Sequence, residues 1–187
     1  MSEKIDLRII KTKKNLYEGL IKLMEDNKFE DIKVSDICSI SLVNRSTFYD
    51  HYSDKYELLY DLMENLRKEL SIKLEENIDT ESPREYYLKG IKLFLEHINE
   101  HNNTYNSILK NNTEGTLLDI AYYTITKDVE KNINNTKYTK NIPSEIISRF
   151  YVSGIINVCI EYIKFKDKYS IEDIVSYIDK LLPKDIY

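Results

Sequence analysis

The chain has no tryptophan, only four glycines and only three prolines among its 187 residues. Glycine and proline are the residues that most often interrupt a helix, so their scarcity leaves few places where a helix must stop. The sequence also lacks convincing alternating strand runs and repeats of fixed period, while apolar residues recur at helical spacing nearly everywhere. An all-α protein is therefore predicted.

Cysteine is scarce as well. Cys38 and Cys159 lie far apart in the sequence, form no CxxC motif and follow the apolar pattern around them. This distribution favours two buried thiols in a reducing compartment over a disulfide or a zinc site.

No basic, apolar leader opens the chain, and the longest uncharged run, Phe150–Ile160, is far shorter than the roughly 20 residues of a membrane-spanning helix. A cytoplasmic protein without a membrane segment is expected. The sequence shows no glycine-rich phosphate loop, nucleophile elbow or carboxylate pair at fixed spacing, so neither an enzyme nor a bound cofactor is predicted.

A basic excess is also missing, because the formal net charge is −5. Proteins that bind nucleic acid are often basic. Any binding to DNA must therefore depend on where the charges lie rather than on their sum.

Helix caps and apolar stripes divide the chain into consecutive helices. Asp54 with Glu57, Ser82 with Pro83 and Glu85, and Ser170 with Asp173 are capping signals at three of the starts. The expected helices are a first one ending near residue 27, followed by 35–40, 44–51, 54–77, 83–101, 105–110, 116–132, 144–166 and 170–182.

Two short helices around a tight turn, preceded by a longer helix, have the spacing of a helix-turn-helix unit. Ile37, Val43 and Phe48 are placed to lock the short helices together, which leaves the polar residues of 44–52 facing outward. Asn44 is a plausible N-cap of the second short helix.

Hydrogen-bond donors gather on that second short helix and at the start of the next one. Arg45 and Tyr49 lie four residues apart on one face, with Ser46 beside them. An arginine can bind guanine O6 and N7 or a phosphate. The donors that suit phosphate oxygens are Thr47, Tyr49, His51 and Lys55.

The stretch IKVSDICSISLVNRSTFYDHYSDKYELL resembles the DNA-binding domain of the TetR/AcrR family of transcriptional regulators. About 50 residues are covered, and the positions that agree with the family pattern are Val34, Asp36, Ile37, Val43, Thr47, Phe48, Tyr49, His51, Lys55, Leu58 and Leu59. The resemblance implies a DNA-binding domain over residues 1–54 and a helical regulatory and dimerisation domain over 55–187. It also implies a homodimer on a palindromic DNA operator.

The same resemblance implies roles for individual residues. Thr47, Tyr49, His51 and Lys55 would contact DNA phosphates, and residues 44–46 would lie at the groove-facing start of the recognition helix. An effector bound to the C-terminal helices would control DNA binding, most simply as a repressor released by a small molecule.

Three residues depart from the family pattern. Lys33 replaces the usual threonine cap, and Leu42 replaces the turn glycine, where a left-handed backbone would cost roughly 1 kcal/mol or more. Asp50 would repel phosphate, so it must point away, accept a hydrogen bond from cytosine N4 or pair with a base such as Lys55.

The segment FYVSGIINVCIEYIKFKDKYSIEDIVSYIDKLLP resembles a C-terminal domain found in a subset of the family that includes the activator of a dihydroxyacetone-kinase operon. This resemblance leaves a second possibility open, in which the controlling partner is a protein. Helix 146–163 is apolar on most sides with small residues at its centre, and a second apolar stripe follows over residues 171–182. Both helices are expected to pair with their copies in a second subunit, and burial within one subunit is the alternative. The predicted interface residues are Phe150, Gly154, Ile155, Tyr162, Ile174 and Ile178.

Two further features allow a functional or a merely structural interpretation. The predicted walls of an effector pocket are Phe94, Ile98, Tyr122 and Tyr123, although tyrosine is so common here that packing is the simpler explanation. His97 and His101 have the i, i+4 spacing of a metal-binding pair. No metal site is predicted, because the sequence identifies no third ligand and Glu100 is more simply part of a solvated face.

Overall fold

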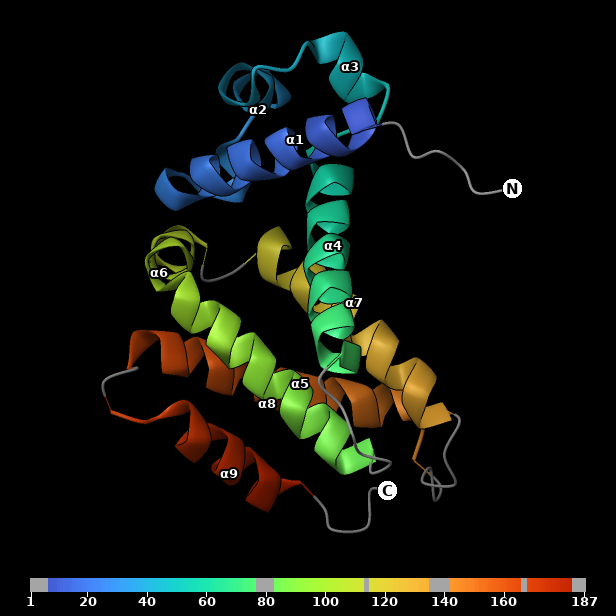
Figure 1. The fold of residues 1–187 in the computed structure, drawn as a ribbon, viewed down its shortest axis with the longest axis vertical. Coiled ribbons are helices and arrows are strands. Elements are labelled where there is room, and N and C mark those ends of the chain that lie inside the picture. Colours follow the sequence, from blue (N-terminus) through green and yellow to red (C-terminus); the bar gives the residue numbers. More distant parts are fainter. Residues whose placement is uncertain (1–6, 77–82, 113–114, 135–141, 166–167, 183–187) are drawn as a thin grey trace. The chain divides into compact units, whose positions relative to one another are not determined.

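The computed structural model describes residues 7–76, 83–112, 115–134, 142–165 and 168–182, and every element in these ranges is helical (Figure 1). The helices are α1 (Leu7–Asp26), η1 (Phe29–Asp31), α2 (Val34–Ser41), α3 (Arg45–Tyr49), α4 (Lys55–Glu76), α5 (Pro83–Glu100), α6 (Asn102–Asn111), α7 (Thr116–Asn134), α8 (Ser144–Lys164) and α9 (Ile171–Leu181). The all-α prediction is confirmed.

One of the predicted capping boxes forms as expected and another forms in part. Ser170 and Asp173 form the expected capping box at α9, with a 3.0 Å bond from the Asp173 amide to the Ser170 hydroxyl. Asp54 caps α4, but Glu57 returns to Ser53 rather than to Asp54. Ser82 lies outside the described residues.

Other details differ from the expectation. Residues 29–31 form a short 3₁₀ helix that is not among the predicted helices, and α6 begins three residues earlier than predicted. At the start of α2 the Lys33 side chain makes no cap hydrogen bond, because an ammonium group has no acceptor for a backbone amide. The Asp36 carboxylate nevertheless accepts a hydrogen bond from the Lys33 backbone amide at 3.2 Å.

The chain divides into two compact units. The first comprises Met1–Met63 together with Ser107–Ile120, and the second comprises Glu64–Asn106 together with Ala121–Tyr187. The unit that contains the helix-turn-helix residues therefore extends beyond the expected segment 1–54 and includes the end of α6 and the start of α7.

The first unit is built around the apolar stripe of α1. Leu16, Leu20 and Met24 are buried against residues of α2, α3 and α4, which include Ile37, Phe48, Leu58 and Leu59. The close approach of α1 and α2 depends on Gly19, where a β-carbon would lie 2.0 Å from the Ser41 hydroxyl. The upper part of Figure 1 shows α2 and α3 beside α1.

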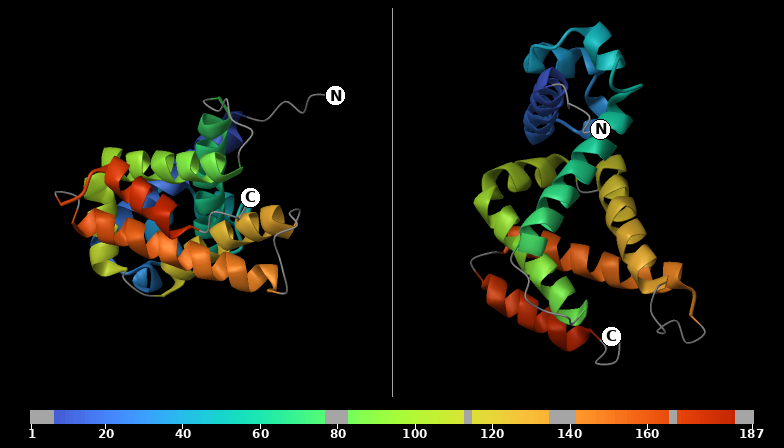
Figure 2. Two further views of the ribbon diagram at one scale, coloured as in Figure 1. Left: turned by 90° about the horizontal axis from the view of Figure 1, so that it is seen from below. Right: turned by 45° about the vertical axis from the view of Figure 1, so that its right-hand side comes forward.

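In the second unit α5, α8 and α9 pack together (Figure 2). Arg84 of α5 bonds the Asp179 carboxylate of α9 at 2.7 Å. Cys159 of α8 is buried in this unit and Cys38 is buried in the first, and both are free thiols, as predicted. Burial raises the pKa of the Cys159 thiol to about 12.

By length and composition alone, helix α8 could cross a membrane. In the folded chain 33% of its most apolar window is buried. Its buried residues Val152, Ile156 and Cys159 alternate with exposed ones at helical spacing. One side of α8 therefore packs on its own chain, and the other side is left to solvent.

Candidate nucleic-acid interface

The turn between α2 and α3 sets the direction of α3. Leu42 adopts φ 55° and ψ 38°, the left-handed conformation that is costly for a residue with a β-carbon, and it is the one non-glycine residue with positive φ in the described part of the chain. Its amide bonds the Ser39 carbonyl, and Val43 bonds the Cys38 carbonyl at 3.0 Å. The turn thus keeps the geometry that a glycine would provide, with a leucine side chain that is 92% exposed.

Helix α3 begins at Arg45 with Asn44 at the N-cap position. The predicted side-chain cap is not formed, because no hydrogen bond joins the Asn44 side chain to the first turn. The side chain is exposed, as are those of Arg45 and Ser46, while Thr47 is half-buried. The start of α3 therefore presents three consecutive polar side chains to solvent.

Phe48 holds this helix in place. It is fully buried and meets Tyr49 edge-on at 5.4 Å and Tyr52 at 5.8 Å between ring centroids. Tyr49 is 58% exposed and His51, half-buried, lies against Tyr52. With Phe48 buried on one side of α3, the opposite, polar side of the helix faces solvent.

Lys55 is placed differently from the expectation of a free phosphate contact. Its ammonium donates to the carbonyls of Phe29, Glu30 and Ile32 at 2.6–2.8 Å, and it lies 4.8 Å above the ring of Phe29. Burial lowers the pKa of Lys55, and the charges of Glu30 and Asp31 oppose that shift. Lys55 therefore satisfies backbone carbonyls in and directly after η1, and it does not pair with Asp50. A contact between Lys55 and DNA remains a prediction.

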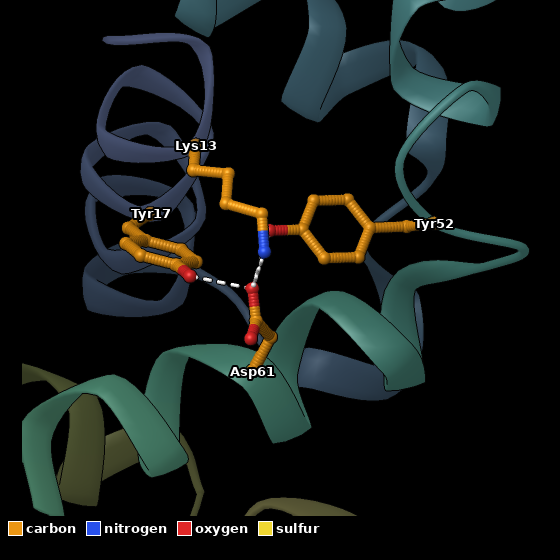
Figure 3. Close-up of polar contacts among 4 residues, drawn as sticks. All are labelled: Lys13, Tyr17, Tyr52 and Asp61. Atoms are coloured by element: carbon orange, nitrogen blue, oxygen red, sulfur yellow. Dashed lines mark hydrogen bonds and ion pairs between the residues drawn. The ribbon is translucent and has the colours of Figure 1, made fainter. Parts of the chain in front are cut away.

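A carboxylate anchors the helix-turn-helix unit to α4, and its position was not predicted. Asp61 Oδ2 accepts hydrogen bonds from Lys13 Nζ at 2.8 Å, Tyr17 OH at 2.6 Å and Tyr52 OH at 2.7 Å (Figure 3). Burial alone would raise the pKa of Asp61, but these three donors together lower it. The shared acceptor joins α1, the segment after α3 and α4.

A buried asparagine joins the end of α6 to the same unit. Asn112 is 1% exposed; its side-chain oxygen accepts from the Phe29 amide at 2.7 Å, and its amide nitrogen donates to the carbonyls of Met24, Asn27 and Ile108 at 2.9–3.4 Å. The neighbouring Asn111 donates to the Glu25 carbonyl at 2.9 Å. The end of α6 thus supplies polar partners to the backbone where α1 ends and η1 begins.

The residues predicted to line an effector pocket do not share one environment. Ile98 is buried, Phe94 and Tyr122 are half-buried, and Tyr123 is 50% exposed with Lys127 over its ring. Asn157 of α8 donates to the Tyr122 hydroxyl at 3.0 Å. A pocket formed by these four side chains remains a prediction.

The predicted dimer residues separate into two groups. Tyr162, Ile174 and Ile178 are buried within their own chain, so they are core positions of the second unit. Phe150 is 72% exposed, Ile155 is half-buried, and Gly154 is exposed, with no atom within 4 Å of the point where a β-carbon would lie. In α8, in α9 and at the C-terminal end of α8, further apolar side chains are exposed that were not predicted at the interface, namely Ile146, Phe165, Tyr177 and Leu181.

A groove of about 530 Å³ runs between α8 and α9. Its lining includes Phe165 from the end of α8 and Tyr177 and Leu181 from α9. The groove therefore adjoins the exposed apolar side of these two helices.

Comparison with known protein families agrees with this architecture. Residues 81–184, more than half of the chain, match a TetR family described as the C-terminal region of transcriptional regulators. A curated relative from Bacillus subtilis (strain 168), the uncharacterized HTH-type transcriptional regulator YxbF, is 32% identical over 88 residues. That match covers 46% of this chain and 22% of the relative's length.

Solved structures extend the similarity over almost the whole chain. A TetR transcriptional regulator from Streptococcus agalactiae 2603V is 25% identical with a TM-score of 0.66, and the match covers 96% of this chain and 97% of that one. The dihydroxyacetone kinase operon activator DhaS shares the fold at 22% identity and a TM-score of 0.53, covering 91% and 93% of the two chains. The subset of the family expected from the C-terminal segment is thus among the similar folds.

Proposed function

Because the chain belongs to the TetR family of transcriptional regulators, we propose that α3 is a recognition helix that enters the major groove of a DNA operator. The observation that carries this proposal is the two-sided character of α3: Phe48 is fully buried, whereas Asn44, Arg45 and Ser46 are exposed. A helix anchored on one side can present base-reading side chains in a fixed orientation.

We assign recognition of the DNA bases to Arg45. Asn44 and Ser46 lie beside it and would face the same groove. Arginine binds guanine O6 and N7 through two parallel hydrogen bonds. Thr47, Tyr49 and His51 are assigned to phosphate oxygens, which would fix the register of the helix on the duplex. Lys55 would reach a phosphate only by giving up one of its carbonyl partners, so it is the weakest of the proposed contacts.

Operator binding would require two copies of the chain, paired through the exposed sides of α8 and α9. Large apolar side chains there are exposed, notably Phe150 at 72% and Leu181 at 76%, and Gly154 leaves open space in front of α8. Burying such a surface is favourable, and it explains why an apolar helix is only partly covered by its own chain. The second copy also makes a palindromic operator the natural target.

The C-terminal helices would control DNA binding. Residues 107–120 belong to the same compact unit as the helix-turn-helix, while the residues directly before and after them belong to the other unit. A small molecule bound near Phe94, Ile98, Tyr122 and Tyr123 would favour one arrangement of this segment over another, which is a population shift between two states. Release from the operator, and hence repression in the absence of the effector, is the simplest outcome.

A second proposal replaces the small molecule with a protein partner. It is favoured by the fold shared with an operon activator, and by the scattered exposure of the four predicted pocket residues. The protein would act in the cytoplasm in either case. Native mass spectrometry of the chain purified from its cells distinguishes a retained small molecule from a stoichiometric protein partner.

The DNA-binding proposal is tested by replacing Arg45 with alanine. We expect Arg45→Ala to reduce discrimination between a footprinted operator and a scrambled duplex by about 1–3 kcal/mol, measured by fluorescence anisotropy at fixed salt. Lys89→Ala, which removes the same charge from the exposed side of α5, is the matched control. If Arg45→Ala weakened binding to both duplexes equally, Arg45 would be a phosphate contact only. If it weakened binding to neither duplex, α3 would not be part of the DNA interface.

A further inference from the structure

A cluster of metal-ligating side chains lies at the end of α5, away from the residues assigned to DNA. His97, Glu100 and His101 each offer one ligand atom, and these atoms all lie within 4.8 Å of one another. The two imidazole rings are 4.6 Å apart between centroids. Glu100 is therefore placed to act as the third ligand that spacing alone did not identify.

The backbone holds these side chains on one face. Residues separated by three and four positions are neighbours on a helix surface. The His101 amide bonds the His97 carbonyl at 3.1 Å, and the Tyr105 amide bonds the His101 carbonyl at 3.1 Å, so helical geometry continues through the cluster. The ring of Tyr105 also meets that of His97 edge-on at 5.9 Å. His97 and Glu100 are thus carried by α5, and His101 by the turn residue that directly follows it.

The donor set indicates which ion it suits. Neutral imidazole nitrogens and a carboxylate oxygen are ligands of zinc and of neighbouring divalent transition metals, whereas calcium and magnesium prefer oxygen alone. His97 is half-buried, and Glu100 and His101 are exposed, so an ion can enter from solvent. Three protein ligands leave a fourth position of a tetrahedral zinc ion for water or another small ligand.

Charged groups from two helices surround His97. Burial, followed by the nearby His101 and Lys73, lowers the pKa of His97, while Glu100 and Glu69 oppose the shift. The carboxylate of Glu69 on α4 adds negative charge near the cluster.

We propose that His97, Glu100 and His101 form a binding site for a divalent transition metal ion of the zinc type. His97 and Glu100 belong to α5, and His101 is the residue between α5 and α6. The bound ion would hold the junction of the two helices in its helical form. This site depends on no part of the DNA-binding proposal.

The test is calorimetric titration of Zn²⁺ into the full chain, free of any affinity tag and stripped of metal with a chelator. One saturable ion per chain is expected. His97→Gln and His101→Gln should each weaken zinc binding by about 10-fold or more, a loss at least as large as that typical of residues that only support metal ligands. His51→Gln replaces the third histidine of the chain and should leave zinc affinity unchanged.

Far-UV circular dichroism without metal establishes that each variant is folded before its titration is interpreted. Cobalt binding provides a second readout, because cobalt bound through imidazole and carboxylate lacks the charge-transfer absorption of a thiolate complex. The proposal is overturned if no saturable binding occurs, or if the His97→Gln/His101→Gln double variant binds zinc as tightly as the original chain. A thiolate absorption band would overturn it as well, since it would place the ion on Cys38 or Cys159.

Discussion

At the scale of single residues, Leu42 combines a left-handed backbone with a side chain that contacts almost nothing. Its φ is 55° and 92% of its side chain is exposed. A β-carbon in this conformation costs roughly 1–2 kcal/mol, and no buried contact compensates for it.

We expect Leu42→Gly to raise the free energy of unfolding by roughly 0.5–1 kcal/mol in chemical denaturation. The relief of strain exceeds the larger conformational entropy that glycine gains in the unfolded chain. Leu42→Ala keeps the β-carbon and should bring no comparable gain. Equal stabilisation by alanine and glycine would show that exposure of the leucine, and not backbone strain, is the unfavourable feature.

Asp61 is a residue through which pH should act on the stability of the first unit. Its pKa is lowered in the folded protein by the donors Lys13, Tyr17 and Tyr52, which more than offset burial. A carboxyl group whose folded pKa lies below its unfolded pKa stabilises the fold above the unfolded pKa, about 3.9. This stability is lost as the pH falls from there through the folded pKa.

We expect Asp61→Asn to lower the free energy of unfolding near neutral pH by about 1.5–3 kcal/mol, because hydrogen bonds to a charged acceptor are lost. The difference from the original chain should shrink below about pH 4, where the carboxyl group of the unfolded chain takes up a proton before that of the folded chain does. Urea denaturation across this pH range measures both effects, with the exposed Asp50→Asn as control. A penalty that does not change with pH would mean that the charge of Asp61 is not what matters.

At the scale of elements, the polar contacts of Asn112 connect the end of α6 with η1. The Phe29 amide has the Asn112 side chain as its acceptor at 2.7 Å, and both groups are buried. Leaving a buried donor without a partner costs about 1–3 kcal/mol.

We expect Asn112→Ala to destabilise the protein by at least that amount, in thermal and chemical unfolding. Asn111→Ala is the matched control, since its half-buried side chain donates mainly to a single carbonyl, that of Glu25, and should cost about 0.5–1.5 kcal/mol. A smaller loss for position 112 than for position 111 would contradict the role assigned to the buried amide.

The sequence predicted the helices well because local signals determine them: apolar periodicity, capping residues and the rarity of glycine. It also identified Phe48 as the buried support of α3 and Leu42 as the anomalous turn residue. What it missed are contacts between distant residues. Nothing local to Asp61 or Asn112 indicates three hydrogen-bond donors or a backbone partner, and nothing local to Gly19 indicates that Ser41 lies against it.

Burial explains the other differences. Tyr162, Ile174 and Ile178 were predicted at the dimer interface because an apolar stripe does not reveal which other element covers it. The same limit applies to Lys55, whose ammonium is directed to three carbonyls of a 3₁₀ helix that the sequence did not predict. Spacing alone could not distinguish these contacts from a phosphate contact.

At the scale of the whole molecule, self-association should depend on the exposed side of α8. We expect Phe150→Glu to shift the protein from dimer to monomer in sedimentation velocity, because a charge would be buried at the centre of an apolar interface. Ile72→Glu places the same charge at an exposed apolar position of α4, 55% exposed, and should leave the dimer intact. If Phe150→Glu remained dimeric while Ile72→Glu became monomeric, the interface would not lie on α8.

The central claim is that α3, held by Phe48, reads duplex DNA and is duplicated by self-association. Its most direct test is selection of binding sites from a random pool of duplexes by the purified chain. The account predicts enrichment of an inverted repeat whose half-sites are about one helical turn apart, roughly 34–36 Å. A pool that shows no enrichment, or that converges on a single unrepeated site bound by one chain, would contradict it.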